Sequence, residues 1–129
     1  MPVRLASLSS VKPLHLPGRD LQWLVTRETL GAQQLAVAIM NVPPHTVVRP
    51  LHSHSGIEEV ILILAGQGEA WIDGERAFFR EGDAVLFPAD SQHQVRNTGD
   101  TPLTTASIFS APTDPDSYIL YDRDVFAEP

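Results

Sequence analysis

Cysteine is absent from the 129-residue chain. This excludes disulfides, thiolate metal sites, cysteine nucleophiles and CxxC redox chemistry, so any metal must be bound through nitrogen and oxygen. Basic residues are also scarce, because nine Lys and Arg stand against sixteen Asp and Glu, for a formal net charge of −7. Nucleic-acid and anionic-membrane partners both require a basic surface. We therefore expect neither.

Long hydrophobic runs are missing as well. The longest, residues 35–40 and 60–65, contain six residues each, far below the roughly 20 that span a bilayer. Ser9, Ser10 and Lys12 interrupt the N-terminal region, which leaves no apolar stretch of the kind that a secretory signal needs. We therefore expect a cytoplasmic protein with no membrane partner.

Short apolar runs separated by turn residues predict an all-β chain. No stretch shows a sustained helical period, while 11 Pro and 8 Gly interrupt the chain at short intervals, a pattern typical of a sandwich or barrel. Asp73-Gly74 predicts a two-residue hairpin, Pro43-Pro44 ends a strand, and residues 98–102 have turn chemistry. The strands are expected at residues 21–26, 34–42, 47–52, 59–65, 69–72, 76–79, 84–87, 92–97 and 103–111.

The length predicts one domain spanning residues 1–129. We expect a jelly-roll-like barrel at about residues 34–111, because such a barrel hides its sheet edges within a short chain. The arms, residues 1–33 and 112–129, are expected to be irregular apart from the strand at 21–26. The C-terminal arm should pack on the outside of the barrel or on a second subunit.

Three of the five histidines form a recognisable pattern. His52 and His54 are two residues apart, so on a strand both side chains project to one face, close enough to share one ion. Ser55-Gly56 then provides a turn into Glu58-Glu59 and the apolar run 60–65, which we expect to be buried on both faces. A carboxylate at the start of such a strand needs a partner. His93 follows 34 residues after Glu59, directly after another turn.

Each of these residues also has a structural interpretation. An isolated His-x-His pair is a weak signal for a metal, and Glu59 alone is typical of a solvated strand end. His15 and His45 are interpreted as surface or hydrogen-bonded residues. Glu58 competes with Glu59 as the functional carboxylate, and strand alternation places the two on opposite faces. The combination within one small cysteine-free β domain favours a functional site.

Two motifs resemble the signatures of the cupin superfamily, which consists of small double-stranded β-helix (jelly-roll) barrels. They are His52-x-His54-x4-Glu59-x6-Gly66 and Gly82-x5-Pro88-x-Asp90-x2-His93-x3-Asn97. The resemblance covers about residues 34–111. Thr46 and Asp90 replace two glycines of the family pattern. The turn at Thr46, beside His45, must therefore be built differently, whereas Asp90 tolerates left-handed backbone.

The resemblance implies a metal site made of His52, His54, Glu59 and His93, with one divalent transition metal ion per chain. Three imidazoles and one carboxylate suit several first-row ions: Mn, Fe or Ni are favoured, and Zn, Co or Cu are alternatives. Four protein ligands leave two adjacent positions of an octahedron open. Pro88, Asn97, Gly66 and Gly82 are interpreted as turn residues, and Trp71, Phe78, Phe79 and Phe87 as core or subunit-interface residues.

Three functions fit this site. The leading hypothesis is a metal-dependent enzyme of the dioxygenase or oxidase kind acting on a small organic molecule. A second is an isomerase, cyclase or lyase in which the metal is a Lewis acid, and a third is a non-catalytic small-molecule-binding cupin. No catalytic acid or base is identified, although His45, Gln92 and Gln94 are candidates for groups next to the ligands. The scarcity of such groups favours chemistry at the metal itself.

Strand parity predicts a largely apolar pocket. The residues expected to point inward are Val48, Pro50, Ile61, Ile63 and Val95, and a pocket of this kind favours an apolar or aromatic ligand. A small barrel with apolar strands would gain from burying one face. Related small cupins are usually dimers, so we expect a homodimer with the N-terminal arm or an edge strand crossing the interface.

Overall fold

The computed structural model describes residues 2–128, which form eleven strands, one short α-helix and two 3-10 turns at Leu8–Ser10 and Pro115–Ser117. The helix α1 spans Arg27–Leu30. The strands are β1 Leu14–Leu16, β2 Arg19–Val25, β3 Ala36–Val42, β4 His52–Ser53, β5 Glu59–Ala65, β6 Gln67–Ile72, β7 Glu75–Arg80, β8 Ala84–Phe87, β9 His93–Asn97, β10 Leu103–Phe109 and β11 Ile119–Leu120. Among the described residues, no helix has the length and hydropathy of a membrane span.

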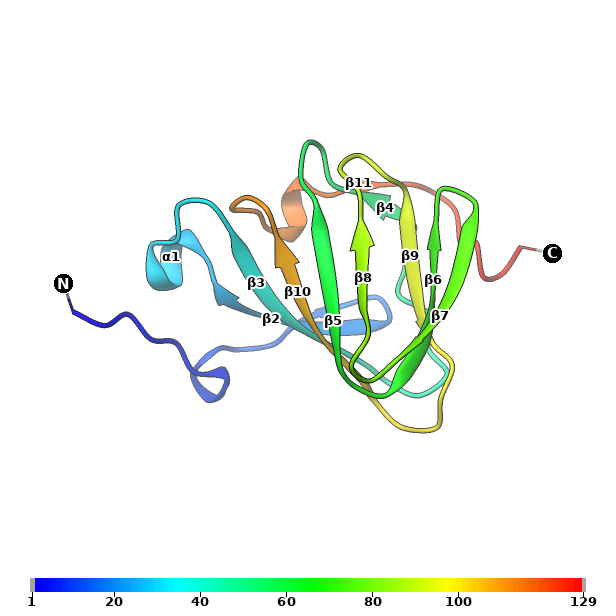
Figure 1. The fold of residues 1–129 in the computed structure, drawn as a ribbon, viewed down its shortest axis with the longest axis horizontal. Coiled ribbons are helices and arrows are strands. Elements are labelled where there is room, and N and C mark those ends of the chain that lie inside the picture. The colour runs from blue at the N-terminus through cyan, green and yellow to red at the C-terminus, as the bar shows by residue number, and fades with distance from the viewer. Residues whose placement is uncertain (1, 129) are drawn as a thin grey trace.

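Two antiparallel sheets make up the barrel (Figure 1). One has the strand order β1-β2-β3-β10-β5-β8 and the other β11-β4-β9-β6-β7. Their inner faces share a hydrophobic core in which Ile61, Ile63, Val42 and Leu103 are almost completely buried. The all-β jelly-roll fold predicted from the sequence is confirmed.

The turns form where the sequence predicts them. Asp73 and Gly74 both have positive φ, 46° and 97°, and they join β6 to β7 as a two-residue hairpin. Asp90 is also left-handed, with φ 67°. At Thr46, where the family pattern has glycine, the preceding His45 takes the positive φ of 53° instead. Asn, Asp and His tolerate this region better than most residues, so the turn is built without the glycine.

Asn97 joins the end of β3 to the turn between β9 and β10, as the sequence predicts for a turn residue. Its side-chain Nδ2 donates to the carbonyls of Val42, Pro43 and Thr101, at 2.8–3.1 Å. Its Oδ1 accepts a hydrogen bond from the Gly99 amide at 2.8 Å. One buried amide therefore satisfies backbone groups on both sides of the turn between β9 and β10.

The N-terminal arm is more regular than expected. β1 and β2 form a hairpin in which Leu14 pairs with Leu21, and β2 continues the larger sheet by pairing with β3. The turn depends on Gly18, which has φ 80° and whose missing Cβ would lie 2.0 Å from the Val47 carbonyl oxygen. Pro13 precedes β1 and Pro17 lies in the turn of the hairpin, and neither residue is typical of a strand. The arm thereby adds Arg19 and Leu21 to the barrel wall.

Two other expectations need correction. The strand predicted at 47–52 is reduced to β4, with Val47 in an isolated bridge to Arg96, because Pro50 has no N–H to donate to a ladder.

The second correction concerns β5, which was expected to be buried on both faces and is buried on one face only. Leu62 and Leu64 are 37% and 44% exposed, because no element within residues 2–128 covers these two side chains.

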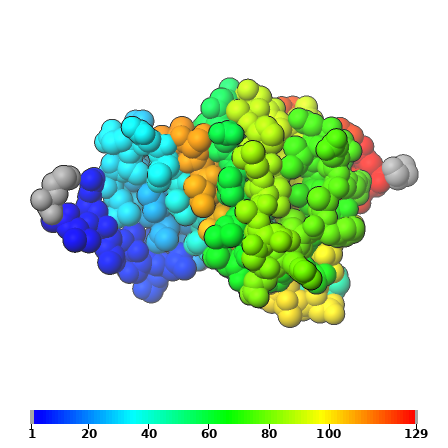
Figure 2. All heavy atoms as spheres, in the orientation of Figure 1, coloured from blue at the N-terminus to red at the C-terminus, as the bar shows by residue number. Residues whose placement is uncertain are grey.

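The C-terminal segment lies along the outside of the smaller sheet, in agreement with one of the two expectations for this arm. β11 pairs with β4, and Val125 is buried against Leu51 and Trp71. The Phe126 ring lies beneath the guanidinium groups of two arginines on the sheet. Figures 1 and 2 show the two termini at opposite ends of the molecule, with the N-terminal residues projecting beyond the barrel.

Candidate metal centre

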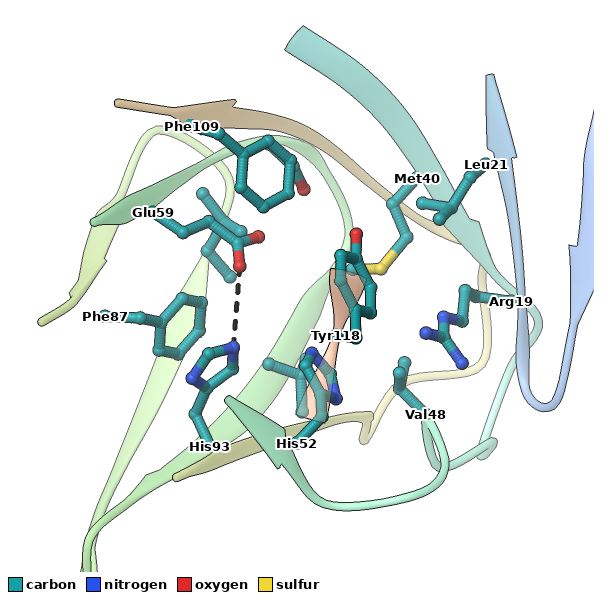
Figure 3. Close-up of a pocket in the computed structure, with 13 residues that line it drawn as sticks. Arg19, Leu21, Met40, Val48, His52, Glu59, Phe87, His93, Phe109 and Tyr118 are labelled. Atoms are coloured by element: carbon teal, nitrogen blue, oxygen red, sulfur yellow. Dashed lines mark ion pairs between the residues drawn. The ribbon is translucent and has the colours of Figure 1, made fainter. Parts of the chain in front are cut away.

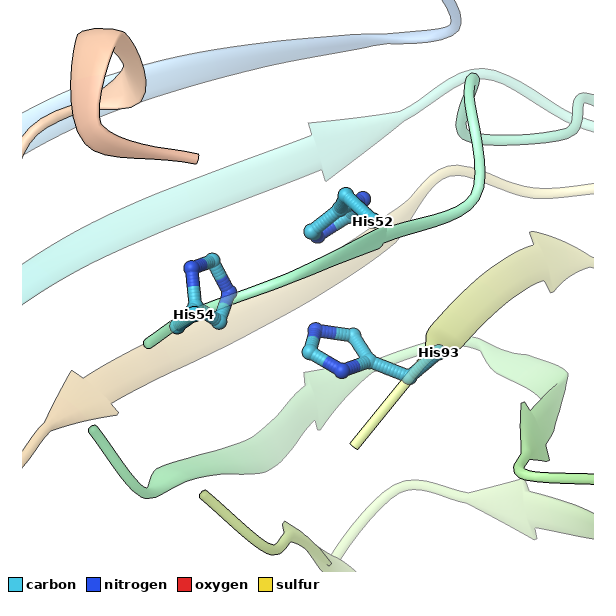
Figure 4. A group of neighbouring side chains, drawn as sticks. All are labelled: His52, His54 and His93. Carbon is cyan, nitrogen blue, oxygen red and sulfur yellow. The ribbon is translucent and has the colours of Figure 1, made fainter. Parts of the chain in front are cut away.

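Three histidines converge inside the barrel (Figure 4). His52 lies on β4 and His54 directly follows that strand, while His93 begins β9 and pairs with His52 in the ladder. One nitrogen from each ring lies within 4.8 Å of the others. All three side chains are buried. This is the spacing that a single metal ion requires.

Glu59 lies against the same cluster. It begins β5 and is 7% exposed, and its Oε1 lies 3.0 Å from His54 Nε2 and 3.5 Å from His93 Nε2. Glu58 is exposed, in line with the prediction that the two carboxylates face opposite sides. The structure therefore brings together all four residues that the sequence singled out.

The hydrogen bonds of the rings leave nitrogens available for a metal. The Nδ1 of His52 lies 3.0 Å from the Pro50 carbonyl oxygen, and the Nδ1 of His93 lies 3.1 Å from that of Ser91. A carbonyl only accepts, so in both rings Nδ1 carries the hydrogen and Nε2 keeps its lone pair. His93 Nε2 and His54 Nδ1 are buried without a hydrogen-bond partner among the described residues. Such orphaned nitrogens fit a cluster built to bind an ion.

The protonation states also suit metal binding. Burial, helped by the charge of His93, lowers the pKa of His52 to about 3. Burial opposes the ionisation of Glu59, but the hydrogen bond from His54 and the nearby His93 ring outweigh it and lower the pKa of this carboxyl. A neutral imidazole and an ionised carboxylate are the forms that ligate metals.

A cavity opens from this cluster into the barrel (Figure 3). Val48, Ile61 and Val95 line it, as strand parity predicts, whereas Pro50 and Ile63 do not. Ile63 is buried in the core instead. Polar residues and further apolar ones complete the wall. The lining consists of Arg19, Leu21, Met40, Val48, His52, Glu59, Ile61, Phe87, His93, Val95, Ser107, Phe109 and Tyr118.

Tyr118 is a site residue that the sequence did not reveal. Its ring stacks on His52, with centroids 5.3 Å apart and an interplanar angle of 8°, and it meets His54 edge-on at 4.4 Å. Burial, followed by the nearby Glu59 charge, raises the pKa of the Tyr118 hydroxyl. The hydroxyl therefore stays protonated at neutral pH. The residue lies just before β11, so only the pairing of that short strand with β4 brings it to the cavity.

Arg19 is the second residue that sequence reasoning missed. It begins β2 and is only 6% exposed. Its Nη1 donates to the carbonyl oxygens of Pro17 and Arg49, at 3.1 Å and 2.7 Å. Burial lowers the pKa of the guanidinium. The residue falls in the arm that was expected to be irregular, and no motif marks it.

The remaining candidates lie away from the cavity. His15 and His45 are exposed and pair with Asp20 and Asp100, each at 2.6 Å, so the structural interpretation of these two histidines is confirmed. His45 is therefore not next to the ligands, and Gln92 and Gln94 do not line the cavity either. Gln94 is fully buried and instead joins the Val48 carbonyl to the Val125 amide.

The aromatic residues divide between core, surface and cavity wall. Phe79 and Trp71 are buried, whereas Phe78 is 74% exposed. Phe87 is buried in the core cluster, as expected, and its ring also stacks on His93 with centroids 4.2 Å apart. It thus supports one of the candidate ligand rings.

Comparison with known proteins places the chain in a family. The profile described as "Cupin domain" matches residues 38–109, and the chain belongs to this family. A relative from Streptomyces cyaneus, "Polyketide synthase CurC", is 31% identical over 99 residues, which are 75% of this chain and 62% of the relative. "Protein SchB" of Streptomyces halstedii is 32% identical over 97 residues, 75% of this chain and 70% of the relative.

Solved structures agree on the fold. The crystal structure of a "predicted oxalate decarboxylase" from Thermotoga maritima superposes with a TM-score of 0.73 at 24% identity, covering 83% of this chain and 98% of the other. The chain thus forms a cupin barrel in which three histidines lie close enough together to share one metal ion.

Proposed function

We propose that His52, His54, Glu59 and His93 bind one divalent transition metal ion and that the protein is a metal-dependent enzyme acting on a small organic molecule. The observation that carries the proposal is the convergence of three buried histidines against the Glu59 carboxylate, with His93 Nε2 and His54 Nδ1 making no hydrogen bond within residues 2–128. Nitrogen and oxygen ligands of this kind suit Mn, Fe or Ni, with Zn, Co or Cu as alternatives. The bound ion would provide redox or Lewis-acid chemistry at the cavity wall.

Dioxygenase or oxidase chemistry is the leading assignment. Besides three of the candidate ligands, His52, Glu59 and His93, the titratable groups that line the cavity are Arg19 and Tyr118. Neither is a general base at neutral pH, because Arg is always protonated and the pKa of Tyr118 is raised. The cavity thus favours a reaction centred on the metal over one that needs a protein base.

Tyr118 favours a second candidate, a non-redox isomerase, cyclase or lyase. Tyr118 lines the cavity, and its hydroxyl stays protonated at neutral pH, so it would donate a hydrogen bond to an oxyanion that develops there. In this assignment Tyr118 stabilises charge while the metal polarises a carbonyl or carboxylate.

Elemental analysis of the purified protein tests the proposal. Near-stoichiometric Mn, Fe or Ni in the wild type, lost in His52→Ala and Glu59→Ala, is expected. The surface variants His45→Ala and Glu58→Ala serve as matched controls and should keep the metal. No metal even after reconstitution, or equal metal in all five proteins, would refute the metal centre.

Substrate assays then separate the candidate functions. Oxygen consumption with catechols, flavonols or enediols supports the redox enzyme, whereas no uptake by the Fe, Mn and Ni forms refutes it. Conversion without oxygen supports the non-redox enzyme. A ligand that binds tightly and is returned unchanged identifies a binding protein instead.

We also propose that a second copy of this chain covers the apolar outer face, which we define as the exposed side chains Leu62, Leu64, Leu86 and Ile108. They lie on β5, β8 and β10, which are neighbours in the larger sheet, and are 37–49% exposed. Contiguous apolar patches on a sheet are typical of interfaces. A twofold interface can bury the same face of both copies at once.

A further inference from the structure

Arg19 presents unused hydrogen-bond donors to the cavity. The side chain is 6% exposed and lines the same cavity as the candidate ligands. Only Nη1 is occupied, by the carbonyls of Pro17 and Arg49. Within residues 2–128, Nε and Nη2 make no hydrogen bond, and the guanidinium forms no ion pair with a carboxylate.

A buried guanidinium without an anionic partner is costly. Burying a charge away from water costs on the order of several kcal/mol unless an opposite charge compensates for it. The carboxylate that faces the cavity is Glu59. In Figure 3, however, Arg19 lies on one side of the view and Glu59 with His93 on the other, with His52 and Tyr118 between them. Glu59 also already bonds to His54.

A metal in the proposed centre makes the imbalance larger. A divalent ion, one carboxylate and one guanidinium together leave two positive charges in a cavity whose remaining walls are mainly apolar. Low local dielectric strengthens the attraction of such a site for negative charge. A small anion would therefore compensate for the positive charge in this cavity.

The geometry points to an anionic organic ligand whose carboxylate binds Arg19. This inference rests on the proposed metal centre for the other end of the ligand. The carboxylate accepts hydrogen bonds from Nε and Nη2, which form one edge of the planar guanidinium and match a carboxylate in bidentate fashion. The body of the ligand lies against Leu21, Met40 and Val48, and its far end faces the histidines. The class is thus a carboxylic acid with an apolar body.

Binding of butyrate and of 1-butanol, a neutral molecule of similar length, tests the assignment. Each is titrated calorimetrically into the purified, metal-analysed protein. Loss of a bidentate charged contact is expected to weaken butyrate binding about 10- to 100-fold in Arg19→Gln, while 1-butanol binding stays the same. Arg19→Lys, which keeps the charge but not the fork, should give an intermediate affinity.

Arg49→Gln is the matched control. Arg49 is a neighbouring arginine, but it pairs with Asp124 at 2.7 Å, is 53% exposed in its side chain and does not line the cavity. Butyrate affinity should therefore be unchanged in this variant.

The outcomes separate this inference from the proposed function. Equal butyrate affinity in wild type and Arg19→Gln, with metal present, overturns the Arg19 anchor and leaves the metal enzyme standing. Arg19-dependent butyrate binding in protein that takes up no metal even after reconstitution supports the anchor and refutes the metal centre. If Arg19→Gln does not fold, the calorimetric comparison of the two compounds in the wild type still tests the inference. A wild type that does not bind butyrate more tightly than 1-butanol overturns it.

Discussion

At the scale of the residue, the site is a set of side chains held in their ligating forms. Carbonyl oxygens of Pro50 and Ser91 fix the tautomers of His52 and His93. Burial keeps His52 neutral, and the hydrogen bond from His54 with the nearby His93 ring keeps Glu59 ionised. In the proposed metal centre these two side chains would therefore not have to lose protons before binding an ion.

The first prediction concerns His52 in metal-free protein. Because burial lowers its pKa to about 3 while the unfolded chain titrates near 6.5, the unfolded state binds more protons between these values. The stabilisation is complete above about pH 6.5 and is lost as the pH falls, by about 2 kcal/mol at pH 5. Urea unfolding at pH 7 and pH 5 measures this, and His52→Gln should show a correspondingly smaller decrease. Identical pH dependence in both proteins would contradict the prediction.

A second residue-scale prediction concerns Asn97. Asn97→Ala leaves three loop carbonyls and the Gly99 amide without their partner, so the free energy of unfolding should fall by about 3 kcal/mol. Gln67→Ala, which removes one exposed hydrogen bond at 3.3 Å to Thr98, is the control and should change it by less than about 0.5 kcal/mol. Denaturant unfolding of both variants measures the difference, and equal losses would be inconsistent with the proposed role.

At the scale of the element, the short strands β4 and β11 decide the composition of the site. β4 places His52 and delivers His54, and its partner β11 holds Tyr118 over both rings. Both strands contain two residues, so their position depends on neighbours more than on their own ladder. The Tyr121 hydroxyl lies 2.9 Å from Ser53 Oγ and further attaches this segment to β4.

Tyr118→Ala should therefore expose the centre. Two aromatic contacts, each worth about 0.5–1.5 kcal/mol, are lost, so a chelator should remove the metal about ten-fold faster. Leu120→Ala on the same segment is the control, because its side chain is 60% exposed, and its rate should match the wild type. Stopped-flow chelation with a chromogenic chelator gives the rates. An unchanged rate in Tyr118→Ala would show that the ring does not cover the metal.

At the scale of the whole molecule, the apolar outer face predicts a homodimer. Light scattering at micromolar concentration should give twice the chain mass of 14.2 kDa. Leu64→Lys should convert the protein to monomer, because a charge in a twofold interface is buried twice. Phe78→Lys is the control. Phe78 is also exposed but lies on β7 of the other sheet, so this variant should remain dimeric. A monomeric wild type, or dissociation by Phe78→Lys alone, would contradict the assignment.

Much of the barrel follows from local signals. The bounds of β5 and β8 agree with those predicted, because an apolar run bounded by turn residues leaves little freedom. The hairpin at Asp73-Gly74 and the end of β3 before Pro43 likewise depend on adjacent residues alone. The β1–β2 hairpin was missed, because β1 has only three residues and lies between Pro13 and Pro17, which are atypical of a strand.

The sequence by itself determined the fold class, and its resemblance to the cupin motifs implied the four candidate ligands, because alternation, turn chemistry and motif spacing are properties of neighbouring residues. Only the tertiary structure decided the rest of the cavity. Arg19 and Tyr118 are 99 positions apart and come from arms that carry no motif, yet both line it. Their placement results from β2 pairing with β3 and β11 pairing with β4. Such long-range pairings depend on the packing of the whole chain, which no local pattern encodes.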